Sequence, residues 1–208
     1  MSTCLQAQQQ LVTTLGHQRL TLNCVGTETA IGQRFRILVS TLSTDAGTVL
    51  ASLIGQPALL TASGRQARPL HAYITQVATG TAHDHLTLEP WTAYLAHGCN
   101  SRVFQHMTVF DILDCVFAPW QGKGRLAPCW RFEIGERHDY PIRSLTTQDQ
   151  ESDLGFAERL MSEEGLFHYF EHEGDPASPA LGRHTMIIAE HDRSRVRSVR
   201  ADTEPAFG

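Results

Sequence analysis

The hydrophobic pattern of this chain changes its period near Met107, and this change limits the folds that the chain can adopt. Before it, apolar residues recur at every second position, as Phe35, Ile37 and Val39 do between Arg34, Arg36 and Leu38. Alternation with period two is typical of half-buried β-strands. After it, apolar side chains recur at helical spacing, at Val109, Ile112, Leu113, Val116 and Phe117. The pattern therefore predicts a β-rich first part and a second part that contains helices.

Short strands separated by turns are predicted for the first hundred residues. The strand ranges are 18–25, 35–39, 56–62, 69–77 and 85–89, and turn-like sequences separate several of them. Between the second and third strands, Leu50 and Leu53 share one face of a short predicted helix, which Gly55 would end. This arrangement is typical of a small β-barrel or sandwich.

Two helices and four strands are predicted for the second part. The first helix begins at Thr108, where Asp111 completes a capping pattern, and stops at Pro119. The second helix covers residues 149–164, and Gly165 occupies its C-terminal cap. The strand ranges are 130–134, 143–147, 166–170 and 185–189. The second part is therefore α+β. We predict a barrel domain over residues 1–100, an α+β domain over 101–192 and an exit linker over 193–208.

Charge and hydropathy argue against several classes of protein. The net charge of -5 does not indicate a general nucleic-acid binder. No apolar run approaches the roughly 20 residues that span a bilayer, so stable membrane insertion is not expected. Residues 1–10 lack the basic start and apolar stretch of a signal peptide. Export by the general secretory route is therefore not expected.

The cysteines do not form a recognisable framework. Their number is odd and no pair has CxxC spacing, which argues against both a disulfide scaffold and a zinc site. We predict free, buried thiols in a reducing cytoplasm, at Cys4, Cys24, Cys99, Cys115 and Cys129.

Four carboxylates near the second predicted helix are the strongest catalytic candidates. Paired carboxylates support glycoside hydrolysis, and the set comprises Glu151, Asp153, Glu163 and Glu164. Negative charge is favoured in a first helical turn, however, and Arg159 lies one or two turns further on. We therefore interpret these residues as capping and ion-pairing groups. The sequence also lacks Gly-x-Ser-x-Gly, and the segment 122–124 lacks a P-loop frame. No catalytic residue and no cofactor are predicted.

The histidines suggest a metal site only by their number, which is eleven. His83 and His85 share one face of a strand, and His168 and His172 lie far apart on another strand, while His184 and His191 are isolated. No HExxH is present, and the spacing does not bring four ligands together. We predict exposed or hydrogen-bonded histidines and no metal.

Three segments carry the most specific motifs of the chain. They are 86–91, which closes on Pro90 and Trp91, then 101–105 with the helix start 108–113, and then 148–172. In this order and with these gaps, they resemble the N-terminal region of Vgr-type spike proteins of type VI secretion machines. The motif positions, which we expect to be structural, are Pro90, Trp91, Arg102, Phe104, Gln105, Asp111, Glu151, Asp153, Phe156, Arg159, Leu160, Glu164, Gly165, Tyr169 and Phe170.

This resemblance implies a fold and a mechanical role. Vgr-type proteins are similar to the baseplate hub of contractile phage tails, so a mainly β chain is expected, with a small β-barrel domain followed by an α+β insert. The hub is a trimer whose barrels form a ring on the hexameric tube. A second barrel and a needle follow in the family, and neither is expected within this sequence. For Trp91 and Phe104, packing between barrel and insert and contact between subunits both remain open.

The resemblance also implies partners and a route of export. The partners are the tube ring, baseplate proteins and effector cargo. The protein would reside in the cytoplasm before firing and would then be secreted through the machine to puncture a membrane, with no enzymatic activity of its own. Three alternatives remain: the tail hub of a contractile prophage, a tail-tip peptidoglycan hydrolase and a stand-alone binding adaptor. Neighbouring genes would distinguish the first of these from a secretion spike.

Overall fold

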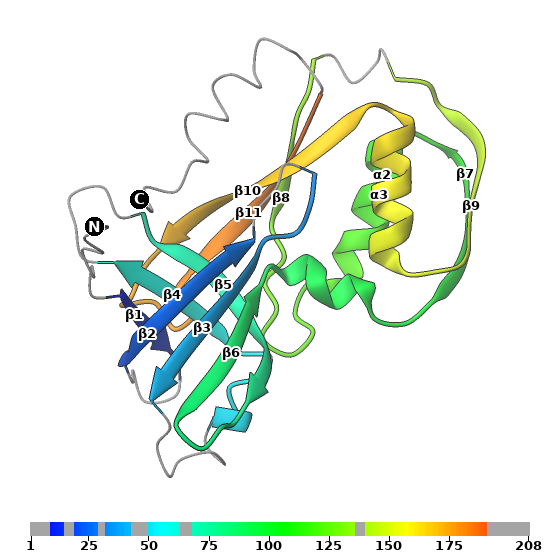
Figure 1. Ribbon diagram of the computed structural model, residues 1–208. Coiled ribbons are helices and arrows are strands. Elements are labelled where there is room, and N and C mark those ends of the chain that lie inside the picture. Colours follow the sequence, from blue (N-terminus) through cyan, green and yellow to red (C-terminus); the bar gives the residue numbers. More distant parts are fainter. Residues whose placement is uncertain are drawn as a thin grey trace, which may run out of the picture.

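A closed barrel of six strands forms the first part of the computed structural model (Figure 1). The structure describes residues 9–14, 19–28, 32–42, 50–62, 68–135 and 140–190. The barrel strands are β1 (Gln9–Thr13), β2 (Arg19–Glu28), β3 (Arg36–Leu42), β4 (Pro57–Ala62), β5 (Leu70–Ala78) and β6 (His83–Glu89). They follow one another around the barrel as β1-β2-β3-β6-β5-β4, and β1 pairs with β4 to close it. The predicted β-barrel and its five predicted strands are confirmed, while β1 is an additional strand.

Alternating side chains fill the barrel. On β3, Ile37 and Val39 are buried whereas Arg36 and Leu38 are exposed, as period two requires. The interior contains Leu11, Phe35, Ile37, Val39, Leu50, Leu53, Ala58, Leu60, Ala72, Ile74, Leu86 and Leu88. Leu50 and Leu53 of the predicted short helix thus pack into this core, and the structure describes that segment from Leu50 onward. Gly55 ends it with φ +81°, a conformation that favours glycine.

The second part contains two helices and two small sheets. In chain order its elements are η1 (Trp91–Ala96), β7 (Asn100–Met107), α2 (Val109–Phe117), η2 (Ala118–Trp120), β8 (Trp130–Glu133), β9 (Arg143–Glu151), α3 (Asp153–Glu163), β10 (Leu166–Gly174) and β11 (Gly182–Glu190). One sheet has the order β10-β11-β8 and the other pairs β7 with β9. Figure 1 shows α2 and α3 between the two sheets. The α+β prediction is confirmed, although η1 and β7 are not among the predicted elements.

Helix α2 begins with the predicted capping box. The backbone N–H of Asp111 donates to Oγ1 of Thr108 over 3.3 Å, and the backbone N–H of Thr108 donates to the Asp111 carboxylate over 3.0 Å. Its apolar face packs against α3 and the three-stranded sheet in one hydrophobic core. The run does not stop at Pro119, because η2 continues it to Trp120 as a turn of 3-10 helix.

Helix α3 begins later than predicted. It starts at Asp153 and not at residue 149, because Ser152 caps it by accepting a hydrogen bond from the backbone N–H of Gly155 over 3.0 Å. The residues before it belong to β9, where Glu151 pairs with Asn100 of β7. Glu151 is therefore a strand residue and does not lie in the first helical turn. The predicted C-terminal cap is confirmed, since Gly165 has φ +67°.

The hairpin of β10 and β11 contacts both parts of the molecule. Near one end, Leu166 and Ile188 belong to the core that contains the two helices. Further along β10, Phe170 packs against the barrel core as well, and near its tip Gly174 lies against Pro69 and Leu59 of the barrel. The division into domains 1–100 and 101–192 stays a prediction, and the predicted linker 193–208 and His191 lie outside the described residues.

Two of the cysteines contradict the prediction of buried thiols. Cys115 is exposed because it lies on the outer face of α2, and Cys99 is exposed in the loop before β7. Cys129 is half-buried, and all three are free. Cys4 lies outside the described residues, as does the side chain of Cys24. Within the described ranges, the helices are too short or too polar to cross a membrane.

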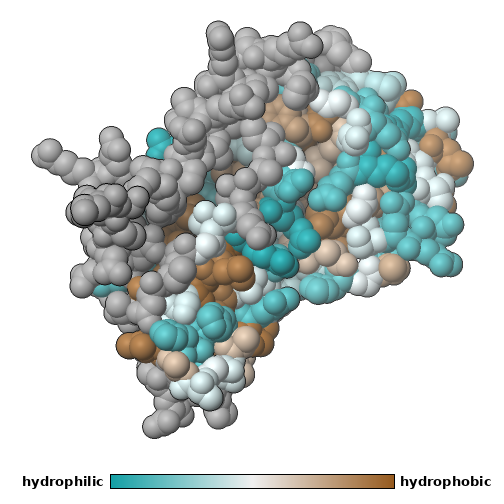
Figure 2. Space-filling model, in the orientation of Figure 1, coloured by the Kyte–Doolittle hydropathy of each residue, from teal (hydrophilic) through white to brown (hydrophobic). Residues whose placement is uncertain are grey.

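The two-stranded sheet has one buried and one exposed face. Phe104 of β7 and Thr146 of β9 point inward and are buried. On the outside, Val103 and Leu145 are more than half exposed, and so is Ile142, which directly precedes β9. Figure 2 shows hydrophobic residues at the margin of the molecule where this sheet lies. The sheet thus contributes to the core from one side and leaves apolar side chains on the other.

Candidate functional site

A buried carboxylate joins three segments of the second part. Oδ1 of Asp153 accepts hydrogen bonds from Asn100 over 2.8 Å and from Gln148 over 3.0 Å, and it also pairs with Arg102. Oδ2 accepts from the indole N–H of Trp120 over 2.9 Å. We call these five residues the aspartate clamp. It holds the start of α3 against β7, β9 and η2.

The polar groups of the aspartate clamp that face inward are hydrogen-bonded to one another. Asp153 is only 4% exposed, and burial alone would raise the pKa of its carboxyl. Hydrogen bonds from Gln148, Trp120 and Asn100, with the charge of Arg102, nevertheless hold that pKa below its ordinary value. Gln148 is fully buried, and its Oε1 accepts from Arg102 over 2.8 Å. Asp153 is therefore a bound anion that has no proton to donate at neutral pH.

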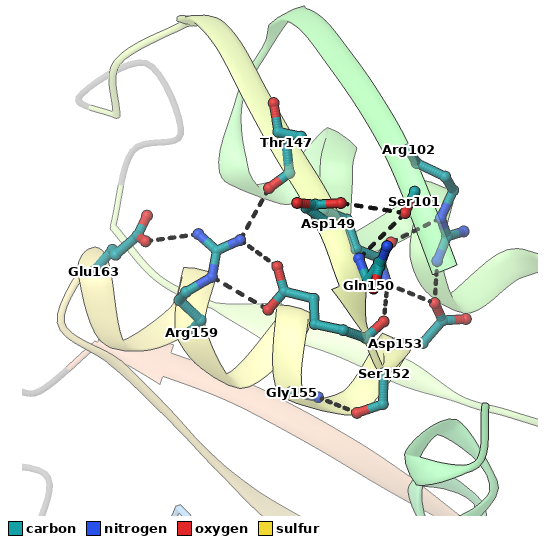
Figure 3. Close-up of polar contacts among 12 residues, drawn as sticks. Ser101, Arg102, Thr147, Asp149, Gln150, Ser152, Asp153, Gly155, Arg159 and Glu163 are labelled. Carbon is teal, nitrogen blue, oxygen red and sulfur yellow. Dashed lines mark hydrogen bonds and ion pairs between the residues drawn. The ribbon is translucent and has the colours of Figure 1, made fainter. Parts of the chain in front are cut away.

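A bulge in β9 directs these side chains. The register with β7 shifts between Asn100 and Arg102, and Gln150 has φ +49°, an uncommon value for a residue other than glycine. Oγ of Ser101 stabilises the bulge by accepting the backbone N–H of Gln150 over 3.1 Å (Figure 3). The bulge lets Gln148 reach the aspartate clamp while Glu151 turns toward α3.

An ion-pair ladder runs along the exposed side of α3. Arg159 binds Glu151 over 2.6 Å and Glu163 over 3.0 Å, and it donates to the carbonyl oxygen of Thr147 (Figure 3). Arg143 of β9 then binds Glu163 over 2.7 Å and Glu164 over 2.6 Å. The ion pairing predicted for Arg159 is therefore present. Each of these carboxylates is bound by an arginine: Glu151 lies at the end of β9, Glu163 lies on the solvated face of α3, and Glu164 caps the C-terminus of that helix.

The apolar motif residues lie in the core beneath these polar groups. Phe156 and Leu160 are fully buried, and Phe156 stacks on Phe104 with ring centroids 5.6 Å apart. Trp91 is also fully buried and meets Phe117 edge to face at 5.3 Å. The structure thus places Trp91 and Phe104 at packing positions. Their burial leaves little surface for a contact with another subunit.

The remaining motif residues do not converge on one site. Pro90 is buried before η1, and Asp111 belongs to the capping box at the start of α2. Gln105 is exposed on β7. Tyr169 donates a hydrogen bond to Glu133 over 2.9 Å, and Phe170 packs edge to face on Phe35 of the barrel at 5.2 Å.

Sequence reasoning missed three members of the aspartate clamp, namely Asn100, Trp120 and Gln148. Gln148 opens the motif over 148–156, and a polar residue that points inward on a strand is the signal that would have found it. That signal is hidden because Gln148 falls between the predicted strand 143–147 and the predicted helix 149–164, whereas β9 extends to Glu151. Asn100 and Trp120 carry no local signal, since their partner lies 53 and 33 residues away.

A second buried polar cluster lies between the barrel and the hairpin. Nδ1 of His71 on β5 lies 2.9 Å from Nδ1 of His184 on β11. Nδ1 of His172 on β10 lies 3.1 Å from the carbonyl oxygen of His71. We call these three residues the histidine junction. The prediction that His184 is isolated is wrong, because its partner is brought to it by the fold from 113 residues away.

The chemistry of both clusters is that of structural contacts. Among the described residues, no group of three or more His, Cys, Asp and Glu side chains could hold a metal ion. His83 and His85, which share a strand face as predicted, are both exposed. His168 is buried and packs against Phe170 with ring centroids 5.8 Å apart. The candidate carboxylates Glu151, Asp153, Glu163 and Glu164 each accept hydrogen bonds from side-chain donors, so none of them is an open carboxylate of the kind that glycoside hydrolysis requires.

Comparisons with known proteins agree on one family. A family model for the phage tail baseplate hub (GPD) matches residues 28–206. The type VI secretion system spike protein VgrG4b of Pseudomonas aeruginosa is 36% identical over 197 residues, which are 88% of this chain and 23% of that protein. The actin cross-linking toxin VgrG1 of Vibrio cholerae is 29% identical over 126 residues, which are 58% of this chain and 10% of that toxin.

The fold has a counterpart among solved structures. The E. coli c3393 protein is described as a component of the type VI secretion system with structural similarity to the T4 bacteriophage tail proteins gp27 and gp5. It matches with a TM-score of 0.65 at 23% sequence identity, over 92% of this chain and 48% of that chain. The chain thus spans less than half of this structure and about a quarter of the spike protein from Pseudomonas.

Proposed function

The chain belongs to the phage tail baseplate hub (GPD) family, and we propose from this premise that it forms the hub region of a type VI secretion spike. The observation that carries the proposal is the 36% identity with a type VI spike protein over 88% of this chain. The closed barrel supports it, because a closed sheet has no free edge strands and suits a load-bearing ring.

We further propose that this region acts mechanically and is not an enzyme. The aspartate clamp and the ion-pair ladder fill their carboxylates with donors, and these contacts stiffen the packing of α3. The toxin from Vibrio shares only 10% of its length with this chain, so its named activity does not have to reside in this region. Stiffness and carriage of cargo are the tasks that such a region would perform.

The proposed partners follow from the same premise. We propose a trimer of the full-length protein, with the barrel docked on a hexameric ring of tube protein and with baseplate proteins and effector cargo as further contacts. Export would proceed through the machine from the cytoplasm when it fires.

Export of the tube protein into culture medium tests the proposal. The strain would lack this gene and paralogous spike genes, and the full-length gene would be restored on a plasmid. We expect export to vanish in the mutant and to return with the gene. A second complementation with Asp149→Asn, a change at an exposed residue of β9, serves as a matched control and should also restore export. If the machine exports its tube without the gene, the secretion role is wrong, and a prophage tail hub becomes the better interpretation.

A further inference from the structure

Hydrogen bonds determine the tautomers of two rings in the histidine junction. The backbone N–H of Trp91 donates to Nε2 of His184 over 2.9 Å, so this nitrogen carries no proton. A neutral His184 therefore carries its proton on Nδ1 and donates it to Nδ1 of His71. His71 then carries its own proton on Nε2, which lies 3.0 Å from the carbonyl oxygen of Ala180. The result is one continuous chain of donors and acceptors.

A further proton on either ring would break this chain of hydrogen bonds. A proton on Nε2 of His184 would point at the N–H of Trp91. A proton on Nδ1 of His71 would point at the proton on His184. Both rings are 2% exposed, so water cannot replace the lost contact without opening the site. The bonds are complete only while both rings are neutral.

The histidine junction connects parts that are distant in sequence. His71 and Trp91 belong to the barrel and the segment that leaves it, whereas Ala180 and His184 belong to the hairpin. His172 adds a third contact, because its Nδ1–H donates to the backbone of His71. Elsewhere on β10, the carbonyl oxygen of His168 accepts the N–H of Gly32 over 2.9 Å.

Aromatic rings surround the histidine junction. Phe35 from the barrel and Phe170 from β10 lie with their ring centroids 5.8 Å and 5.7 Å from that of His184. Tyr73 on β5 lies at 5.7 Å, and its hydroxyl accepts the N–H of Ala127. These rings provide an apolar setting in which a charged imidazole has no anion beside it.

The charged and titratable groups near the histidine junction do not neutralise a proton on it. Burial raises the pKa of Tyr73 and raises that of Tyr94 to about 12, so both are neutral at acidic and neutral pH. On the hairpin, Glu173 and Arg183 point to solvent and bind each other over 2.8 Å. The buried carboxylate of Glu89 lies opposite Tyr73 and is held by Thr75 over 2.6 Å and by Arg36 over 3.4 Å. Within the part of the chain that the structure describes, no hydrogen bond or ion pair joins any of the three rings to a carboxylate. A proton would therefore remain an uncompensated buried charge.

We propose that the histidine junction is a pH-sensitive contact, which holds the β10–β11 hairpin on the barrel while its rings are neutral and releases the hairpin when they are protonated.

The pH range of this release follows from the direction of the pKa shifts. Burial lowers the pKa of His71 and lowers that of His184 well below its ordinary value, with neighbouring imidazoles adding to the effect on His184. Burial lowers the pKa of His172 and of His168 to about 4. An unfolded histidine takes up its proton near the ordinary value of 6.5. The contribution of the histidine junction is thus fully present above pH 6.5 and is lost as the pH falls from there through the lowered pKa values of its rings, that of His172 being about 4.

Nitrogen NMR of the imidazoles in the intact protein tests the geometry directly. At pH 7 we expect the proton of His184 on Nδ1 and the proton of His71 on Nε2. We also expect both rings to titrate below the ordinary value of 6.5, and His184 well below it. Protons on Nε2 of both rings, or titration of both at the ordinary value, would overturn the proposal.

Hydrogen exchange combined with urea unfolding tests the release. After correction for intrinsic rates, amides of β10 and β11 should lose protection between pH 7 and pH 5 before amides of β1 and β4 do. Equal loss in both regions would contradict a local release. In His184→Gln, unfolding takes up one proton fewer than in the wild type. The equilibrium constant of unfolding should therefore change about tenfold less per pH unit. The exposed His85→Gln is the matched control and should keep the wild-type pH dependence, because the histidine junction is intact. A wild-type dependence in His184→Gln would also overturn the proposal.

Discussion

The molecule contains two buried polar clusters that solve the same problem in opposite ways. In the aspartate clamp, Asp153 is kept ionised by an arginine and three neutral donors. In the histidine junction, His71 and His184 are kept neutral by aromatic surroundings and by a chain of hydrogen bonds that has no room for a further proton. A buried polar group can therefore be stabilised by neutralising its charge or by preventing the charge. The two solutions should fail under different conditions.

The largest expected effect is the loss of the aspartate clamp alone. In Asp153→Ala, four donors lose their acceptor and Arg102 becomes a partly buried, unpaired charge. We expect the free energy of unfolding to fall by roughly 3–5 kcal/mol in urea titrations. Asp149→Ala on the exposed face of β9 is the control and should change it by less than about 0.5 kcal/mol. Equal losses in the two variants would show that the aspartate clamp does not stabilise the fold.

The next largest effect concerns the close packing of the β10–β11 hairpin on the barrel at Gly174, which involves no polar group. A Cβ at Gly174 would lie 2.5 Å from Cβ of Pro69 and 2.9 Å from Cδ1 of Leu59. Gly174→Ala should therefore push the hairpin away from the barrel and cost roughly 1–3 kcal/mol in thermal or urea unfolding. Gly135→Ala, where the nearest atom is a side-chain oxygen at 3.6 Å, is the matched control. A Gly174→Ala protein as stable as this control would contradict the close packing.

The pH dependence should distinguish the two clusters. Between pH 6.5 and 5, each neutral buried histidine should reduce the free energy of unfolding by up to about 1.4 kcal/mol per pH unit, because the unfolded chain binds the proton. Asp153 has a lowered pKa, so its contribution is present above its ordinary value of 3.8 and is lost below it. Asp153→Asn should therefore be less stable than the wild type but equally steep between pH 7 and 5. A changed slope in this range would mean that the two clusters are coupled.

The smallest effect concerns the ion-pair ladder. Arg159 is 41% exposed, so solvent screens its pairs with Glu151 and Glu163. Arg159→Gln should cost about 0.2–1 kcal/mol, and the difference from the wild type should shrink in 1 M salt. Arg131→Gln on β8 is the control, because its guanidinium is similarly exposed and also pairs with a carboxylate. Its cost should be equally small and should shrink in 1 M salt in the same way. A loss that persists in high salt would assign Arg159 a packing role over Phe156, 5.2 Å from its ring.

Local patterns predicted most elements of the fold because those elements bury one face. The alternation on β3 and the apolar face of α2 each follow from the period of the backbone, and the residues concerned are buried. The start of α3 was misplaced because residues 149–151 are polar in either a strand or a helix. Only the pairing of β9 with β7 and the cap at Ser152 decide between the two.

The sequence predicts part of the aspartate clamp and none of the histidine junction. Asp153 and Arg159 belong to a recognisable motif, so their importance could be inferred from the sequence, although the donors to Asp153 could not. His71 and His184 carry no local signal at all, because a lone histidine on a strand is equally compatible with an exposed position. Their role depends on a contact between segments that are 113 residues apart.

That separation also sets an order of events during synthesis. All six barrel strands have been made once Glu89 is added, but the strand that supplies His184 comes about a hundred residues later. At roughly 5–20 residues per second, the ribosome needs about 5–20 s to produce it. During this interval Phe35 and His71 have no hairpin to cover them. We therefore expect the nascent barrel to expose this surface until β11 has been synthesised. The barrel, which is made first, is covered only when the last described strand packs against it.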